Sequence, residues 1–92
     1  MVRSFRHKGL ARLYEHDSAK GVTPALLPKV SRILARLDVA QSVEHMNLPG
    51  WRLHPLKGDL TGFWSVWVSA NWRLVFRFHE GDAWDVDLVD YH

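Results

Sequence analysis

The chain has 92 residues, which is enough for one hydrophobic core, so we expect a single domain over residues 1–92. It contains no cysteine, which excludes disulfide frameworks and thiolate metal sites and favours a reducing compartment such as the cytoplasm. The net charge of +2 is unevenly spread: residues 1–57 carry ten Lys and Arg against four Asp and Glu, or +6, and residues 58–92 carry two against six, or −4. The basic part either attracts a polyanion such as RNA or is ordinary solvated charge.

Membrane association is not expected. The first residues, MVRSFRHK, lack the apolar stretch of a signal peptide. No segment approaches the ~20 consecutive apolar residues that a membrane-spanning helix requires. The sequence therefore indicates a soluble protein with no membrane partner.

The first elements in chain order are a short strand and a helix. The apolar start at residues 2–5 predicts the strand. The spacing of Leu10, Leu13 and Tyr14 predicts a helix that begins near Lys8.

A second helix follows, with Thr23 as the expected N-cap and Pro24 at the first helical position. Pro28 comes early enough to distort only the first turn. The apolar residues at helical spacing are Leu26, Leu27, Val30, Ile33, Leu34 and Leu37. The other face carries a basic stripe, which is either solvated or faces RNA: Lys29, Arg32 and Arg36.

After Pro49-Gly50 the apolar period changes from helical to alternating, which predicts strands. The expected strands cover residues 51–56, 62–68, 72–79 and 83–90. Loops of three residues are expected at 69–71 and 80–82, the second with a glycine suited to a left-handed position. The predicted fold class is therefore α+β, with two N-terminal helices packed on an antiparallel sheet.

The register of this sheet follows from collecting the apolar side chains on one face. The expected pairs on that face are Val68 with Trp72, Val66 with Leu74, Trp64 with Phe76, Phe78 with Trp84, Phe76 with Val86 and Leu74 with Leu88. The opposite face then carries Phe63, Ser65, Trp67, Arg73, Val75, Arg77, Asp85, Asp87, Val89 and Tyr91, with Arg77 across from Asp85. This face is either plain solvent surface or a working surface. Arg73 suits a phosphate, or is a cross-strand partner of Asp85 or Asp87.

One polar constellation stands out as a candidate site. His54 and Lys57 lie on a strand interrupted by a proline, which cannot be an ordinary central strand. With Arg73 and the terminal Asp90-Tyr91-His92 they supply imidazoles, a phenol and cations. RNA cleavage needs such groups, because the RNA 2′-OH is the nucleophile and the protein must move protons and stabilise charge on phosphorus. The alternative for His54 is a structural role beside the proline.

No metal or cofactor site is expected. The six histidines form no i, i+4 pair and no HExxH motif. The sequence also lacks a P-loop, a GxGxxG and a GxSxG element. Nucleotide-dependent and serine-hydrolase functions are therefore disfavoured.

Four segments in this order and spacing resemble one family: RSFRHKGL, NLPGWRLHPLKGDLTGFWSV, NWRLVFRF and DVDLVDYH. They are similar to the HigB-type toxins of bacterial toxin-antitoxin modules, within the RelE/ParE superfamily. The resemblance covers essentially the whole chain. It implies a microbial RNase-like fold and a ribosome-dependent, metal-independent endoribonuclease. Such a toxin cuts mRNA in the A site of the 70S ribosome and is held inactive by a HigA-type antitoxin. The toxin itself is expected to be a monomer within the toxin-antitoxin hetero-oligomer.

The resemblance also implies roles for individual residues. The family's basic positions fall on Lys57 and Arg73, and Trp67 stands where relatives often place a basic residue. The family's catalytic positions fall on His54, Asp90, Tyr91 and His92.

Two other functions remain open from the residues. ParE-type members of the superfamily inhibit DNA gyrase, so the fold does not decide the activity. A gyrase inhibitor, however, has no use for His54 together with a terminal Asp-Tyr-His. The third possibility is a non-catalytic module whose basic helices bind RNA or a protein partner.

Overall fold

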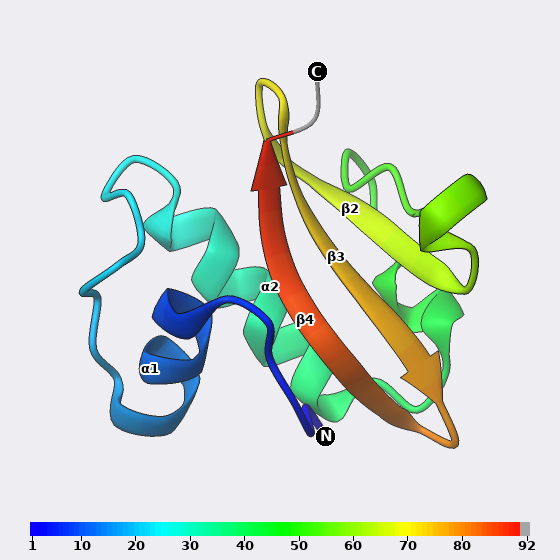
Figure 1. The fold of residues 1–92 in the computed structure, drawn as a ribbon, viewed down its shortest axis with the longest axis horizontal. Helices are drawn as coiled ribbons and strands as arrows, with labels where there is room; N and C mark the ends of the chain where they lie inside the picture. The colour runs from blue at the N-terminus through cyan, green and yellow to red at the C-terminus, as the bar shows by residue number, and fades with distance from the viewer. Residues whose placement is uncertain (91–92) are drawn as a thin grey trace.

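A computed structural model describes residues 1–90 and has two helices on one side of an antiparallel sheet (Figure 1). The helices are α1 (Lys8–His16) and α2 (Leu27–Val39). The strands, in their order across the sheet, are β1 (His54–Pro55), β2 (Phe63–Ser69), β3 (Trp72–His79) and β4 (Asp82–Asp90). Two short 3-10 helices that were not predicted are η1 (Val43–Met46) and η2 (Gly58–Leu60). The predicted α+β class is confirmed.

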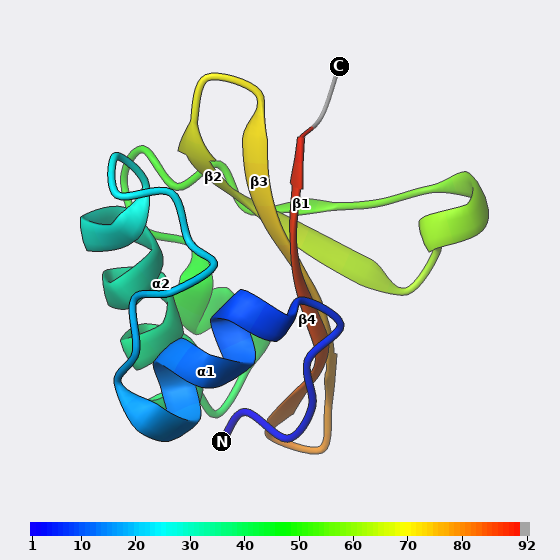
Figure 2. The same ribbon diagram turned by 60° about the vertical axis from the view of Figure 1, so that its left-hand side comes forward.

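The hydrophobic core lies between the helices and one face of the sheet. Leu10 of α1, Ile33 and Leu37 of α2, and Leu74 and Phe76 of β3 are completely buried there. Figure 2 shows both helices on the same side of β3 and β4, while the segment around η2 extends away from them. The opposite face of the sheet is therefore left uncovered by helices.

Among residues 1–90, none of the helices has the length and apolar composition of a membrane-spanning segment.

Helix α1 begins as predicted and packs closely on the turn that follows it. The Nδ1 atom of His7 accepts a hydrogen bond from the backbone N–H of Leu10 at 3.1 Å, which caps the first turn. Gly9 is buried, and a Cβ at this position would lie 2.5 Å from the carbonyl oxygen of Gly21. Only glycine therefore allows this approach of the backbones.

Helix α2 begins later than predicted. Its first residue is Leu27 and its N-cap is Leu26, so Thr23 is not the cap. Residues 24–26 form turns instead, and Pro28 occupies the start of the helix. The missing N–H of Pro28 costs nothing there, because the first amides of a helix have no partner within the helix.

The N-terminal segment was predicted to be a strand, but it does not form a regular one. It runs along β4 and makes two isolated parallel bridges, Val2 with Ala83 and Phe5 with Val86. The backbone N–H of Arg3 also donates to the Ala83 carbonyl at 2.7 Å. This segment covers the outer edge of the first half of β4.

The sheet follows the predicted register at its centre and departs from it near the turns. The pairs Trp64 with Phe76, Val66 with Leu74, and Leu74 with Leu88 are confirmed. At the first turn, Ser69 rather than Val68 pairs with Trp72, and a β-bulge lies between Trp67 and Ser69. Both connecting loops thus have two residues rather than three.

The β3–β4 hairpin shows why its predicted register was wrong. Glu80 and Gly81 both have positive φ, 51° and 80°, as a two-residue type I′ turn requires. Phe78 therefore pairs with Ala83, and Arg77 rather than Phe78 pairs with Trp84. A β-bulge at Asp85, whose φ is 55°, then places one extra residue of β4 opposite β3.

The bulge has two consequences for the side chains. Ala83 takes the core position expected for Trp84 and is completely buried, whereas Trp84 leaves the core cluster. Past the bulge, Val86 and Leu88 face the core as predicted. The predicted contact of Arg77 with Asp85 is present, with Nη2 and Oδ2 2.8 Å apart.

The carboxylate of Asp38 joins the N-terminal segment to both helices. Its Oδ1 accepts hydrogen bonds from the backbone N–H of Val2 at 3.0 Å and from the hydroxyl of Tyr14 at 2.6 Å. The bond from Tyr14 is the main cause that lowers the pKa of Asp38, and burial opposes it. The same bond, together with burial, raises the pKa of Tyr14. The ionised carboxylate and the neutral phenol are thus the stabilised forms.

We predict that Asp38→Asn lowers the free energy of unfolding by about 1 to 2 kcal/mol at pH 7, because two charge-assisted hydrogen bonds become neutral. Because the pKa of Asp38 is lowered in the folded state, its carboxylate stabilises the fold at pH values above the ordinary pKa of 3.8, and this stabilisation is lost as the pH falls through the folded-state pKa. The difference in the free energy of unfolding between the parent and Asp38→Asn should therefore become smaller near pH 3. Thermal unfolding followed by circular dichroism at both pH values measures it.

The matched control is Asp59→Asn, since Asp59 is an exposed carboxylate on η2. It should change the free energy of unfolding by less than about 0.5 kcal/mol. A penalty for Asp38→Asn that is equal at pH 7 and pH 3 would contradict the assignment to the ionised carboxylate.

Candidate active site

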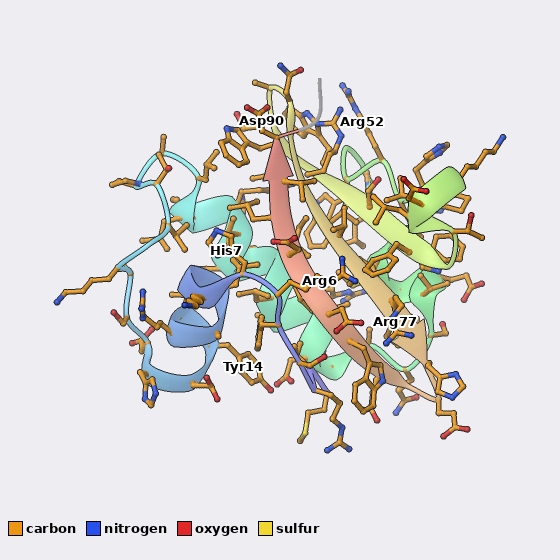
Figure 3. The ribbon with its side chains drawn as sticks, viewed as in Figure 1. Arg6, His7, Tyr14, Arg52, Arg77 and Asp90 are labelled. Atoms are coloured by element: carbon orange, nitrogen blue, oxygen red, sulfur yellow. The ribbon has the colours of Figure 1, made fainter. Side chains whose placement is uncertain are left out.

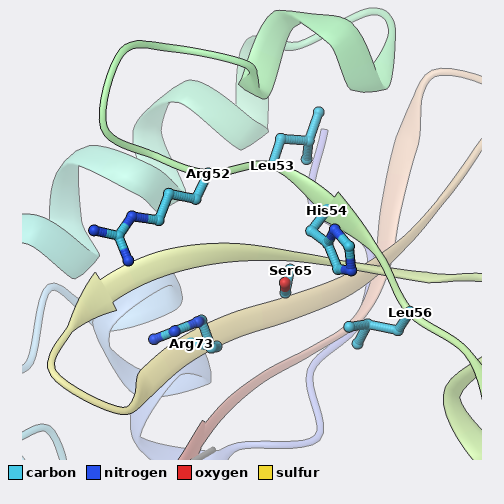
Figure 4. A pocket seen from close by; sticks show the side chains of 6 residues that line it. All are labelled: Arg52, Leu53, His54, Leu56, Ser65 and Arg73. Carbon is cyan, nitrogen blue, oxygen red and sulfur yellow. The ribbon is translucent and has the colours of Figure 1, made fainter.

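An open pocket of ≈ 350 Å³ lies on the sheet face that the helices leave uncovered (Figure 4). The residues that line it are Arg52, Leu53, His54, Leu56, Ser65 and Arg73. Two of them, His54 and Arg73, belong to the predicted constellation. Arg52 was not predicted to take part.

His54 is held at the edge of the sheet by the short strand β1. It pairs with Ser65, and Pro55 pairs with Trp64, so the predicted strand at 51–56 is reduced to two residues. The proline occupies an edge strand, where its missing N–H breaks no ladder. The His54 side chain is exposed and makes no hydrogen bond with any residue in the described part of the chain.

A small apolar cluster fixes the backbone on the other side of His54. Leu56, Phe63 and Val75 are buried together on the open face of the sheet. The backbone N–H of Leu56 also donates to the carbonyl of Phe63 at 2.9 Å. The chain around His54 is thus anchored on a rigid sheet while the imidazole faces solvent.

The strand register places the other candidate residues in two neighbouring rows across the open face. One row contains His54, Ser65, Val75 and Asp87. The next contains Trp67, Arg73 and Val89. Rows on one face are about 7 Å apart, since alternate residues share a face. Arg73 therefore lies one row from His54, at the end of the sheet where β4 finishes.

Arg73 is oriented by hydrogen bonds to backbone carbonyls of the β2–β3 turn and of Trp72. Its Nη1 donates to the carbonyl oxygens of Ala70 at 3.0 Å and Trp72 at 3.1 Å. It forms no ion pair within residues 1–90, so the alternative of a cross-strand pair with Asp85 or Asp87 is not observed. Among residues 1–90, no carboxylate neutralises the charge of Arg73.

The remaining predicted catalytic residues lie at the end of β4. Asp90 is exposed, pairs with Trp72 in the sheet and lies near the β2–β3 turn (Figure 3). Tyr91 and His92 lie outside the described residues. The strand that leads to them thus ends beside Arg73.

Lys57 does not line the pocket. It is an exposed residue at the N-cap of η2, on the arm that extends away from the helices. Its predicted role as a phosphate contact is not tested by this position.

The basic stripe of α2 is partly engaged in contacts of its own. The ammonium of Lys29 lies 4.8 Å from the ring centre of Trp51, and Arg36 Nε donates to the carbonyl of His45 at 3.0 Å. Burial, and secondarily the charge of Arg32, lowers the pKa of Lys29. Arg32 is exposed. Arg32 is therefore the residue of the three whose side chain makes no hydrogen bond, ion pair or cation–π contact within residues 1–90.

Arg52 is the member of the pocket that sequence reasoning missed. Its guanidinium lies 5.0 Å from the ring centre of Trp67, and its backbone has a φ of 52°, which non-glycine residues rarely adopt. The segment WRLHPLKGDL contains Arg52, but a left-handed conformation at an arginine leaves no mark in a sequence. The only available signal was two cations and an imidazole within six residues.

The side chains that line the pocket can carry out acid-base chemistry on a phosphate ester. They comprise one imidazole and two guanidiniums, and no carboxylate lines the pocket within residues 1–90. An imidazole can accept or donate a proton near neutral pH, and guanidiniums suit phosphate oxygens. No group of three or more His, Cys, Asp or Glu side chains in residues 1–90 is arranged to hold a metal ion.

Comparison with known proteins assigns the chain to a family. Residues 3–92 match the model of the HigB-like toxin family, described as the RelE-like toxin of the type II toxin-antitoxin system HigB. An endoribonuclease HigB from Proteus vulgaris is 41% identical over 92 residues, the whole of both chains. Toxin HigB-1 from Vibrio cholerae is 33% identical over 85 residues, or 90% of each chain. The chain therefore belongs to the HigB-like family of RelE-like toxins of type II toxin-antitoxin systems.

Proposed function

We propose that this toxin is a metal-independent endoribonuclease that cuts mRNA in the A site of the 70S ribosome and so arrests translation. The observation that carries the proposal is the pocket in which His54 faces solvent beside the guanidiniums of Arg52 and Arg73. The name of the Proteus vulgaris relative, an endoribonuclease identical at 41% of positions, supports the same activity. Membership of a type II family implies an antitoxin partner, which we propose to be a HigA-type protein.

In the proposed reaction, the 2′-OH of the RNA attacks the adjacent phosphorus and the bond to the 5′ oxygen breaks. One group must remove the proton of the 2′-OH, and another must protonate the leaving 5′ oxygen. We assign these steps to His54 and the terminal Asp90, Tyr91 and His92 as a set. Arg73, with Lys57 at greater distance, stabilises the negative charge that builds up on the phosphoryl oxygens.

The pocket favours a nuclease over the two alternatives. A gyrase inhibitor or a simple binding module gains nothing from an exposed imidazole whose backbone is anchored by a separate apolar cluster. Mapping the 5′ ends of mRNA after induction of the toxin in cells tests the class directly. Cuts clustered within translated reading frames are expected, and intact mRNA with stalled gyrase complexes would overturn the proposal.

We predict that His54→Ala, His92→Gln and removal of His92 each lower the cleavage rate by about 10²- to 10⁴-fold, the range for losing a positioned proton-transfer group. Single-turnover cleavage of mRNA on purified ribosomes measures this loss. The variants should unfold within a few degrees of the parent and still bind the antitoxin.

The matched control is His79→Ala, since His79 is an exposed histidine at the opposite end of β3. It should cleave at the parent rate. Full activity in the variants of His54 and His92 would assign both histidines to structural roles.

Cleavage should depend on presentation of the mRNA by the ribosome. The pocket is open, and Asp87 and Asp90 place negative charge on the strand beside it. Such a surface orients a flexible RNA poorly, so we predict that free mRNA is cut at least about 10²-fold more slowly than mRNA in the A site. Equal rates with and without ribosomes would instead identify an independent nuclease.

The basic stripe of α2 should contribute to ribosome affinity. Replacing Lys29, Arg32 and Arg36 together by glutamine should weaken binding and flatten its dependence on salt. Because Lys29 and Arg36 also make contacts within the fold, Arg32→Gln is the cleaner variant. Sedimentation of the toxin with ribosomes across a salt series measures the slope, and an unchanged slope for Arg32→Gln would show that the stripe is ordinary solvated charge.

A further inference from the structure

Arg52, which lines the pocket, makes a cation–π contact with Trp67. The guanidinium carbon of Arg52 lies 5.0 Å from the ring centre of Trp67. The indole is itself fixed, because its Nε1 donates to the carbonyl of Ala70 at 3.1 Å. The same carbonyl accepts the bond from Arg73 Nη1. One turn thus orients both the ring that supports Arg52 and the neighbouring guanidinium.

The backbone also directs Arg52 toward this ring. The N–H of Trp67 donates to the carbonyl of Trp51 at 2.7 Å, which ties the chain just before Arg52 to β2. At the next residue φ is 52°, so the chain turns at Arg52 itself. A non-glycine residue keeps such a conformation only where its surroundings hold it, and such positions are concentrated at functional sites.

Apart from the contact with the Trp67 ring, the charge of Arg52 has no partner among residues 1–90. Its side chain is exposed and forms no ion pair or hydrogen bond within residues 1–90. Arg52 and Arg73, which both line the pocket, extend to the same side of it (Figure 4). Two planar guanidiniums that face one open space, with no carboxylate among the residues of 1–90 that line it, match the oxygens of a phosphate group.

We propose that Arg52, held by Trp67, binds a backbone phosphate of the mRNA beside the bond that is cut. Trp67 acts as a positioning residue: it carries no charge, but it holds a cation where the pocket needs one. This inference rests on the proposed function, because it assumes that mRNA enters the pocket. It also gives a physical role to the tryptophan that departs from the family pattern.

The test uses the full-length toxin and 70S ribosomes whose A site holds an mRNA with a 2′-O-methyl group at the cleavage position. This mRNA lacks the attacking hydroxyl, so affinity can be measured without cleavage. Arg52→Gln should weaken binding by about 5- to 30-fold and reduce the slope of log affinity against log salt by about 0.7, the value for one phosphate contact of a single strand. With unmodified mRNA, the KM should rise by a similar factor and kcat should change less than about twofold.

A double-mutant cycle tests the positioning role of Trp67. Trp67→Leu should lose part of the affinity, Trp67→Phe should retain most of it, and Trp67→Leu should add nothing in the Arg52→Gln background. Lys20→Gln removes the same charge from an exposed residue of the loop between α1 and α2 that does not line the pocket, and it should bind as the parent does.

The outcomes separate this inference from the proposed function. Unchanged affinity and salt slope in Arg52→Gln would overturn the inference, as would an equal loss on ribosomes with an empty A site, which would point to ribosomal RNA. Additive losses for Arg52 and Trp67 would overturn the positioning role. If the parent protein does not cut unmodified mRNA on the ribosome, the proposed nuclease activity is refuted. The affinity measurements would still decide whether Arg52 contacts the mRNA.

Discussion

Burial of one face of β3 beneath the two helices is the constraint on which the other features depend. Leu74 and Phe76 are completely buried, so the strands on either side must also present apolar residues to the helices. The tight turn at Glu80-Gly81 would shift every side chain of β4 to the wrong face, and the bulge at Asp85 restores the alternation.

The same bulge attaches the N-terminal segment. Asp85 donates its backbone N–H to the hydroxyl of Ser4 at 2.8 Å, and the N–H of Val86 donates to the Ser4 carbonyl at 3.1 Å. The segment then reaches Asp38 through the N–H of Val2. A local irregularity in one strand is thus connected to the position of both helices.

Because the helices cover one face, the other face is available for chemistry. A separate apolar cluster beneath β1 supports His54 without enclosing it. The row that contains Arg73 lies at the end of β4, so this strand ends next to the pocket. In this arrangement the rigid sheet holds the charges while the substrate side stays open.

Much of the fold could be predicted from periodicity. The helical spacing of Val30, Ile33 and Leu37, and the alternation through Leu74 and Phe76, gave the correct layers. The turns could not be predicted in the same way, since two- and three-residue loops differ by one backbone conformation at residues such as Ala70 and Glu80. The same limit explains the late start of α2, where local turns outweighed the capping preference of Thr23.

The lining of the pocket was predicted in part, for the same reasons. His54 and Arg73 were identified because their residue types suit phosphate chemistry, and the register brings them into one pocket. Arg52 was missed because its place depends on a left-handed φ and on a ring fifteen residues later in the chain. Lys57 was placed in the constellation by proximity in sequence, which does not decide the direction of an irregular loop.

The N-terminal segment follows the outer edge of β4 only as far as Val86. Beyond that point the strand continues to Asp90, and its side chains include a carboxylate at Asp87 as well. A bare strand edge is a template on which a second molecule can extend the sheet, and charged side chains oppose this by repelling an identical edge. The carboxylates of Asp87 and Asp90 therefore disfavour the pairing of this edge with an identical one.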